Sequence, residues 1–93
     1  MKVSVQYFGH LGEKLGKEES YDLFLDSKSH LLSEILKELC KRKGKEFSKA
    51  IYHQNGSFNP YITVILNGRV ILNDQIEVSD DCNIFFVPFI DGG

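Results

Sequence analysis

Apolar and polar residues alternate at the start of the chain and then change period. The period of two over residues 2–8 predicts a half-buried strand. Residues 9–19 are polar and contain three glycines, so we expect a long connection there. Alternation returns at Tyr21, Leu23 and Leu25, which predicts a second strand and an antiparallel hairpin with a wide loop.

From Ser29 the apolar period becomes that of a helix. The spacing i, i+3, i+4 and i+7 gives one apolar face, formed by Leu32, Ile35, Leu36 and Leu39. We expect Ser29 to be the N-cap and Gly44 to end the helix. Cys40 widens the apolar face and is interpreted as a small buried hydrophobic residue.

The second half of the chain is dominated by strand signals. Residues 46–61 predict an irregular insertion that contains a possible short helical turn. Residues 62–66 are rich in β-branched residues, and Asn67-Gly68 follows at once, which predicts a tight hairpin with residues 69–72 as the return strand. A polar stretch then leads to a final strand over residues 84–88. These elements predict an α+β domain, a mixed sheet of about five strands packed on one main helix.

The final strand is apolar on both faces, whereas a sheet covered on one side should alternate. If Ile84 and Phe86 face the helix, the residues between them face outward. The expected outward side chains form an apolar patch: Phe8, Phe85, Val87 and Phe89. Such a patch is typical of a partner-binding surface. The alternative is that residues 46–61 cover this face.

Composition excludes several classes of function. Ninety-three residues predict a single domain over residues 1–93. A net charge of −2 argues against binding to nucleic acid or anionic lipid. The longest apolar run, residues 84–90, is far shorter than the ~20 residues of a membrane span. We therefore expect a cytoplasmic protein with neither a membrane nor a nucleic acid as partner.

Nothing in the sequence predicts an independent enzyme. Cys40 and Cys82 are the only cysteines, Cys82 lies in a predicted polar turn, and no Cys or His pair has zinc-ligand spacing. The three histidines are scattered, and neither a phosphate-binding glycine motif nor a nucleophile motif is present. We expect this chain to bind no metal and no cofactor of its own.

The sequence ends in Asp91-Gly92-Gly93, directly after the apolar strand. Glycine has no Cβ, so a diglycine can thread a narrow channel and bring a terminal carboxylate to another protein's reactive centre. We expect residues 89–93 to form a flexible tail. The alternative is a frayed terminus without chemistry.

Three motifs resemble a known family: Tyr7-Phe8-Gly9, the stretch from Asn59-Pro60-Tyr61 to Asn67-Gly68-Arg69, and Pro88 followed by Gly92-Gly93. They are similar to the β-grasp (ubiquitin-like) sulfur carriers of the MoaD and ThiS family, especially the small subunit of molybdopterin synthase. Asp91 departs from the family pattern, in which a small residue precedes the diglycine. Its role stays open.

The resemblance implies a mechanism centred on Gly93. A ubiquitin-activating-like adenylyltransferase would use ATP and Mg to adenylate the Gly93 carboxylate, and a sulfur donor protein would convert it to a thiocarboxylate. As the small, non-autonomous subunit of molybdopterin synthase, the chain would insert its tail into the large catalytic subunit, with Gly92 allowing it to thread. The expected partner-binding residues are Phe8, Phe85, Val87, Pro88, Phe89, Ile90 and Asp91.

Two alternatives remain. The chain also resembles related carriers that supply sulfur for thiamine, cysteine or tRNA thiolation, and ubiquitin-like modifiers that are conjugated to lysines. The C-terminus is activated in the same way in all of these proteins. It could also be a β-grasp interaction module whose tail has no chemistry.

Overall fold

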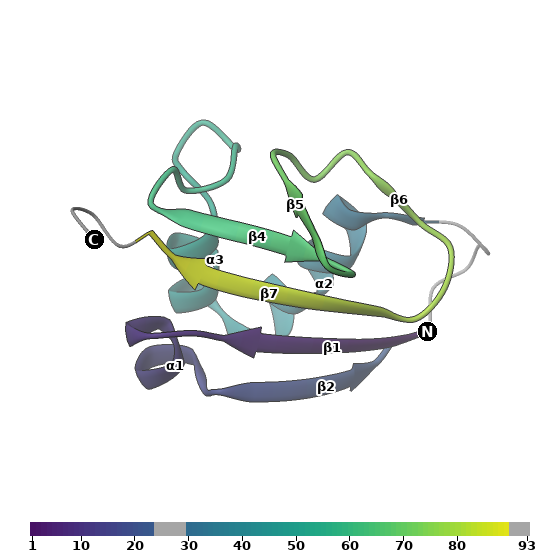
Figure 1. Cartoon of the computed structure of the whole chain (residues 1–93), viewed down its shortest axis with the longest axis horizontal. Coiled ribbons are helices and arrows are strands. Elements are labelled where there is room, and N and C mark those ends of the chain that lie inside the picture. The colour runs from purple at the N-terminus through teal and green to yellow at the C-terminus, as the bar shows by residue number, and fades with distance from the viewer. Residues whose placement is uncertain (24–29, 90–93) are drawn as a thin grey trace.

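Five strands form one mixed sheet in the order β2-β1-β7-β4-β5 (Figure 1). The computed structural model describes residues 1–23 and 30–89. The strands are β1 (Lys2–Tyr7), β2 (Glu18–Asp22), β4 (Ile62–Leu66), β5 (Arg69–Ile71) and β7 (Cys82–Pro88). The two central strands, β1 and β7, are parallel, and the other neighbours are antiparallel. The predicted mixed sheet is therefore confirmed.

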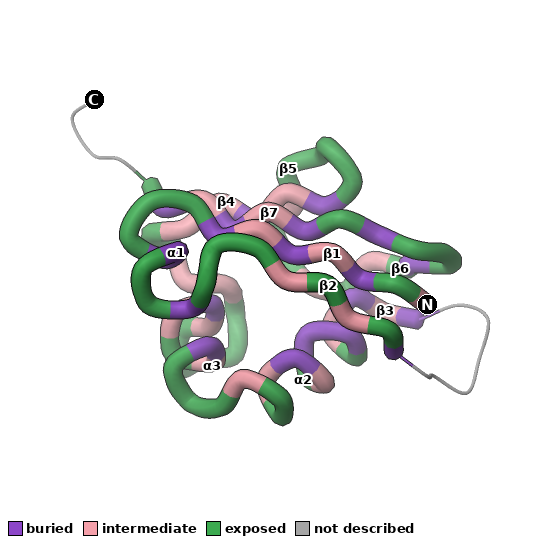
Figure 2. Tube along the Cα trace, turned by 90° about the horizontal axis from the view of Figure 1, so that it is seen from below, coloured by how far each residue is buried: buried purple, intermediate pink, exposed green. Residues whose placement is uncertain are grey.

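Helices cover one face of this sheet. The main helix is α2 (Leu32–Lys43), as predicted, and Gly44 with φ 86° separates it from α3 (Lys45–Ile51). A further short helix, α1 (His10–Leu15), follows β1. Viewed from below, the sheet lies on one side and α2 and α3 on the other (Figure 2). Among the described helices, none is long and apolar enough to cross a membrane.

The core fills the space between the sheet and the helices. Alternate residues of the central strands turn inward, so Val5, Ile84 and Phe86 are fully buried. Three aromatic rings meet there, with Tyr7 stacked on Phe86 at 5.6 Å and Phe47 of α3 edge-on to both. Each of these rings removes a large apolar area from water, so the cluster stabilises the packing of α3 against the sheet.

The long connection predicted for residues 9–19 is wrong, because it contains α1 and the start of β2. Leu11 and Leu15 are four residues apart, so both point into the core from one side of α1. A residue larger than glycine is excluded at Gly12, because a Cβ there would lie only 2.9 Å from the carbonyl oxygen of Tyr7. Leu25 of the predicted second strand lies outside the described residues.

The insertion predicted for residues 46–61 is partly regular. Phe47 and Ile51, again four residues apart, are buried beneath α3. Because α3 packs beside α2, it leaves the opposite face of the sheet open. The alternative in which residues 46–61 cover that face is therefore wrong.

The start of α2 also differs from the prediction. α2 begins at Leu32 with Leu31 as its N-cap, two residues after the predicted cap, and Ser29 itself lies outside the described residues. Carbonyl groups from a distant segment accept the first helical N–H groups instead. Leu32 donates to the Ile76 carbonyl at 2.8 Å, and Ser33 donates to the Asp74 carbonyl at 2.9 Å. A second small sheet, β3 (His30–Leu31) with β6 (Glu77–Val78), holds this segment in place.

Candidate functional site

The candidate site surrounds the end of β7, where the glycine-ended tail begins. The predicted site residues Ile90, Asp91, Gly92 and Gly93 lie outside the described residues. The described part of the site therefore consists of the two surfaces that meet at Phe89.

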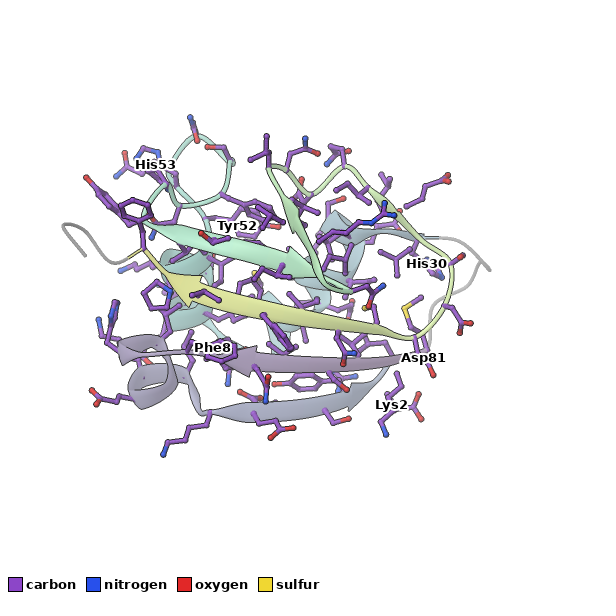
Figure 3. The ribbon with its side chains drawn as sticks, viewed as in Figure 1. Lys2, Phe8, His30, Tyr52, His53 and Asp81 are labelled. Atoms are coloured by element: carbon purple, nitrogen blue, oxygen red, sulfur yellow. The ribbon has the colours of Figure 1, made fainter. Side chains whose placement is uncertain are left out.

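The first surface is the helix-free face of the sheet. In the register, Ile65 of β4 stands opposite Phe85 of β7, and Val70 of β5 stands opposite Ile65. The Phe8 and Phe85 rings meet edge to face at 5.5 Å, and Figure 3 labels Phe8 at the end of β1. We call the outward apolar side chains of this face the outer patch: Phe8, Ile65, Val70, Phe85 and Val87.

The outer patch is open to solvent. Phe8 is 41% exposed and Val70 is 64% exposed, whereas Ile65, Phe85 and Val87 are half-buried. Contiguous apolar surface of this kind marks interaction sites on small domains. The predicted outward orientation of Phe8, Phe85 and Val87 is confirmed, and Phe85 and Val87 are partly covered by their neighbours in the sheet.

Sequence analysis missed Ile65 and Val70 as members of the patch. The signal was present in residues 62–66, because Val64 and Leu66 alternate with Ile65 and face the core. Their contribution to one continuous surface depends on strand order, which places β4 beside β7.

Pro88 does not belong to the exposed surface. It is buried, pairs with Ile62, and faces the helices with Phe86. Gly9, with φ 58°, lies so close that a Cβ there would be 3.2 Å from the Pro88 Cγ. The prediction that Pro88 is a contact residue is therefore wrong. Its side chain packs inside the domain and helps to fix the end of β7.

Phe89 is the last described residue, at the start of the tail, and we call it the tail root. It is also held by the fold. Its N–H donates to the Tyr61 carbonyl at 2.7 Å, which continues the pairing of β7 with β4. Both aromatic side chains are exposed, Phe89 by 63% and Tyr61 by 75%. They border the second surface, a hollow of about 460 Å³ between α1 and α3. We call it the tail-root groove, lined by His10, Leu11, Lys14, Glu46, Lys49, Ala50, Asn59, Tyr61, Ile62 and Phe89.

The two cysteine side chains are poorly suited to act as nucleophiles. Burial raises the pKa of the Cys40 thiol, while burial and the Asp81 carboxylate raise that of Cys82 to about 11. Both thiols are therefore protonated at neutral pH and are weak nucleophiles. Burial likewise raises the pKa of the Tyr7 hydroxyl. Within residues 1–23 and 30–89, no group of three or more His, Cys, Asp or Glu side chains could hold a metal ion.

Phe89, directly after the end of β7, lies between two surfaces, the outer patch on the helix-free face of the sheet and the tail-root groove beside α1 and α3.

Comparison with solved structures shows the fold. The chain superposes on SAMP1 from Haloferax volcanii with a TM-score of 0.77 and 16% identity, covering 100% of both chains. It is similar to a candidate molybdopterin converting factor, subunit 1, from Pyrococcus furiosus, with a TM-score of 0.66, 22% identity, and coverage of 97% and 99%. Small archaeal modifier protein 1 from Methanosarcina acetivorans gives a TM-score of 0.66 at 20% identity, covering 99% and 96%. The fold is the β-grasp, as expected.

Sequence comparison shows the family. No curated protein sequence matches significantly. The ThiS family, however, matches residues 5–93, which include the second half of β1, all of the other strands of the main sheet and the diglycine. This chain belongs to the ThiS family of ubiquitin-like β-grasp proteins.

Proposed function

We propose that this protein is a sulfur carrier whose Gly93 carboxylate is adenylated, converted to a thiocarboxylate, and used as the sulfur source in molybdopterin biosynthesis. The observation that carries the proposal is the family match, which continues through the diglycine to Gly93. The outer patch beside the tail root supports it, because a carrier needs a docking surface close to its reacting group.

The chemistry requires prior activation of the tail. A terminal carboxylate has a pKa of about 3.5 and is ionised at neutral pH, which makes its carbon a poor electrophile. In the proposed first step a carboxylate oxygen attacks the α-phosphorus of ATP, and pyrophosphate leaves. Sulfide delivered by a donor protein then displaces AMP and forms the new C–S bond. ATP, Mg and the catalytic groups belong to the partner enzymes.

The tail is long enough to enter a partner's pocket. Five residues follow Pro88, and an extended chain of this length reaches about 17 Å. In the proposed complex, Gly92 allows the tail to pass a narrow channel while the outer patch docks on the adenylyltransferase first and on the large subunit of molybdopterin synthase later.

Intact-mass spectrometry tests the proposal. The protein is incubated with its adenylyltransferase, ATP, Mg and a sulfur donor, and the expected product has one oxygen replaced by sulfur at Gly93. A variant that lacks Gly92 and Gly93 is the control; it should show no mass change and an unaltered unfolding transition, because both residues follow the folded strands. An unmodified terminus in the presence of an active adenylyltransferase would contradict the proposal.

A second candidate function uses the same activated tail. Small archaeal modifier protein 1 is among the structural neighbours, so we also consider conjugation to lysines of other proteins. Recovery of diglycine remnants on cellular lysines would support a modifier. Restoration of pterin sulfuration with a large subunit would support the molybdopterin carrier.

A further inference from the structure

The tail-root groove is a built feature on the helix side of the sheet, separate from the outer patch. Asn59 joins its walls: the side-chain amide donates to the Ala50 carbonyl of α3 at 3.0 Å, and the side-chain oxygen accepts from the Tyr61 N–H at 2.9 Å. Tyr61 in turn holds Phe89 through its carbonyl. The groove is therefore fixed relative to the tail root.

The groove is basic although the protein as a whole carries a net charge of −2. Lys14 enters it from α1 and Lys49 from α3, with Glu46 as the one carboxylate of the lining. Neither lysine makes an ion pair with any residue in the described part of the chain.

Other basic residues near the end of α2 are already engaged within the fold. Lys43 binds the Glu19 carboxylate and the Leu15 carbonyl, and Arg42 lies over the Tyr21 ring. Lys41 pairs with Glu38. Lys14 and Lys49 also lie in the last turns of their helices, but they line the groove and make no ion pair within the described part of the chain, so they are available to an external acidic group.

We propose that the tail-root groove receives an acidic segment of the adenylyltransferase that activates the tail. This inference rests on the proposed function. Charge complementarity identifies the segment as acidic, and the exposed rings of Tyr61 and Phe89 provide apolar contacts beside it. The polar side chains of the lining are largely exposed, which suits a protein segment better than a small molecule that would need to be enclosed.

The position of the groove favours the adenylyltransferase as the partner enzyme. The groove and the outer patch meet at the tail root, so a partner that covers both holds the root from two sides and directs the tail outward. Every candidate pathway requires tail activation first, and the adenylyltransferase is the partner that all of them share. The groove thus acts as a second contact in the activation complex.

Steady-state kinetics test the groove. Carrier-dependent ATP–pyrophosphate exchange is measured with the adenylyltransferase at low and at physiological salt. For Lys14→Glu/Lys49→Glu we expect the KM for the carrier to rise about tenfold with kcat unchanged, and the salt dependence of KM to weaken. Lys14→Gln/Lys49→Gln, which removes charge without reversing it, should raise KM about threefold.

A matched control carries the same change in net charge. Lys2 lies at the opposite end of the sheet from the last residues of β7 (Figure 3), and Lys37 is exposed on α2. Lys2→Glu/Lys37→Glu should therefore leave KM within about twofold of the wild-type value. All variants must retain the wild-type unfolding midpoint.

Two results would overturn the inference, and they differ in whether they also reject the proposed function. Equal KM values for the groove variant and the control, with an active wild type, would reject the groove while leaving the proposed function intact. Absence of exchange with the wild type would reject both.

Discussion

At the scale of single residues, Cys82 shows how burial changes chemistry. It begins β7 inside the core and is 4% exposed, so the prediction of a polar turn is wrong at this position. Burial and the neighbouring Asp81 raise the pKa of its thiol from an ordinary value of 9.0 to about 11. The folded state therefore favours the protonated thiol.

The stability of the protein should fall at alkaline pH because of this thiol. A pKa that is raised on folding contributes stability that is complete below pH 9, the unfolded value, and is lost as pH rises through about 11. Urea unfolding at pH 8, 9, 10 and 11 measures the loss. Cys82→Ala should show a smaller fall across this range than the wild type, whereas equal slopes would refute the assignment.

At the scale of elements, the segment that precedes β6 anchors two helices. The Tyr52 hydroxyl, just beyond α3, donates to Asp74 Oδ2 at 2.7 Å. The backbone carbonyl of the same aspartate accepts from Ser33 in the first turn of α2. Asp74 thus joins the end of α3 to the beginning of α2.

Tyr52→Phe tests this anchor. It removes one hydroxyl and leaves a half-buried carboxylate oxygen without its donor, so the free energy of unfolding should fall by about 1–2 kcal/mol. Urea unfolding of the variant measures the change. Tyr61→Phe is the matched control, since Tyr61 is 75% exposed, and should change stability by less than about 0.5 kcal/mol. Equal effects would show that the bond to Asp74 contributes nothing.

The elements differ in how much of them the sequence could predict. α2 has a stripe of apolar residues long enough to define its period, and Asn67-Gly68 defines the β4–β5 hairpin. α1 and α3 have only two buried apolar side chains each, so the period of each pattern is too short to distinguish a helix from a loop. β3 and β6 pair two residues each across a long sequence separation, and this contact has no local signal.

Some residues of the candidate site could likewise be predicted from the sequence, and others could not. Alternation alone predicted that Phe85 and Val87 face outward, and applied one step further it would have placed Pro88 inside with Phe86. Ile65 and Val70 join the patch only because β4 and β5 follow β7 in the sheet, which is a property of the tertiary fold. The tail-root groove depends on α1, which was not predicted, and on α3, which was predicted only as a possible short helical turn.

At the scale of the whole molecule, the two faces of the sheet divide stability from recognition. Core packing lies on the helix side, where Phe86 is fully buried between Tyr7 and Phe47. The outer patch lies on the other side, which no helix of residues 1–23 and 30–89 covers. A substitution should therefore affect mainly one property, according to the face on which it falls.

Phe85 and Phe86 allow this division to be tested with identical substitutions at adjacent positions. Phe86→Ala removes a fully buried ring, which should cost about 3–5 kcal/mol of unfolding free energy, while Phe85→Ala on the half-exposed face should cost about 1 kcal/mol. In the exchange assay Phe85→Ala should raise the KM for the carrier at least about tenfold, as loss of a central aromatic contact does. Phe86→Ala, assayed where it remains folded, should keep the wild-type KM because its ring never reaches a partner. Equal losses of stability would contradict the division between the two faces. A wild-type KM for Phe85→Ala would show that the outer patch is not the docking surface.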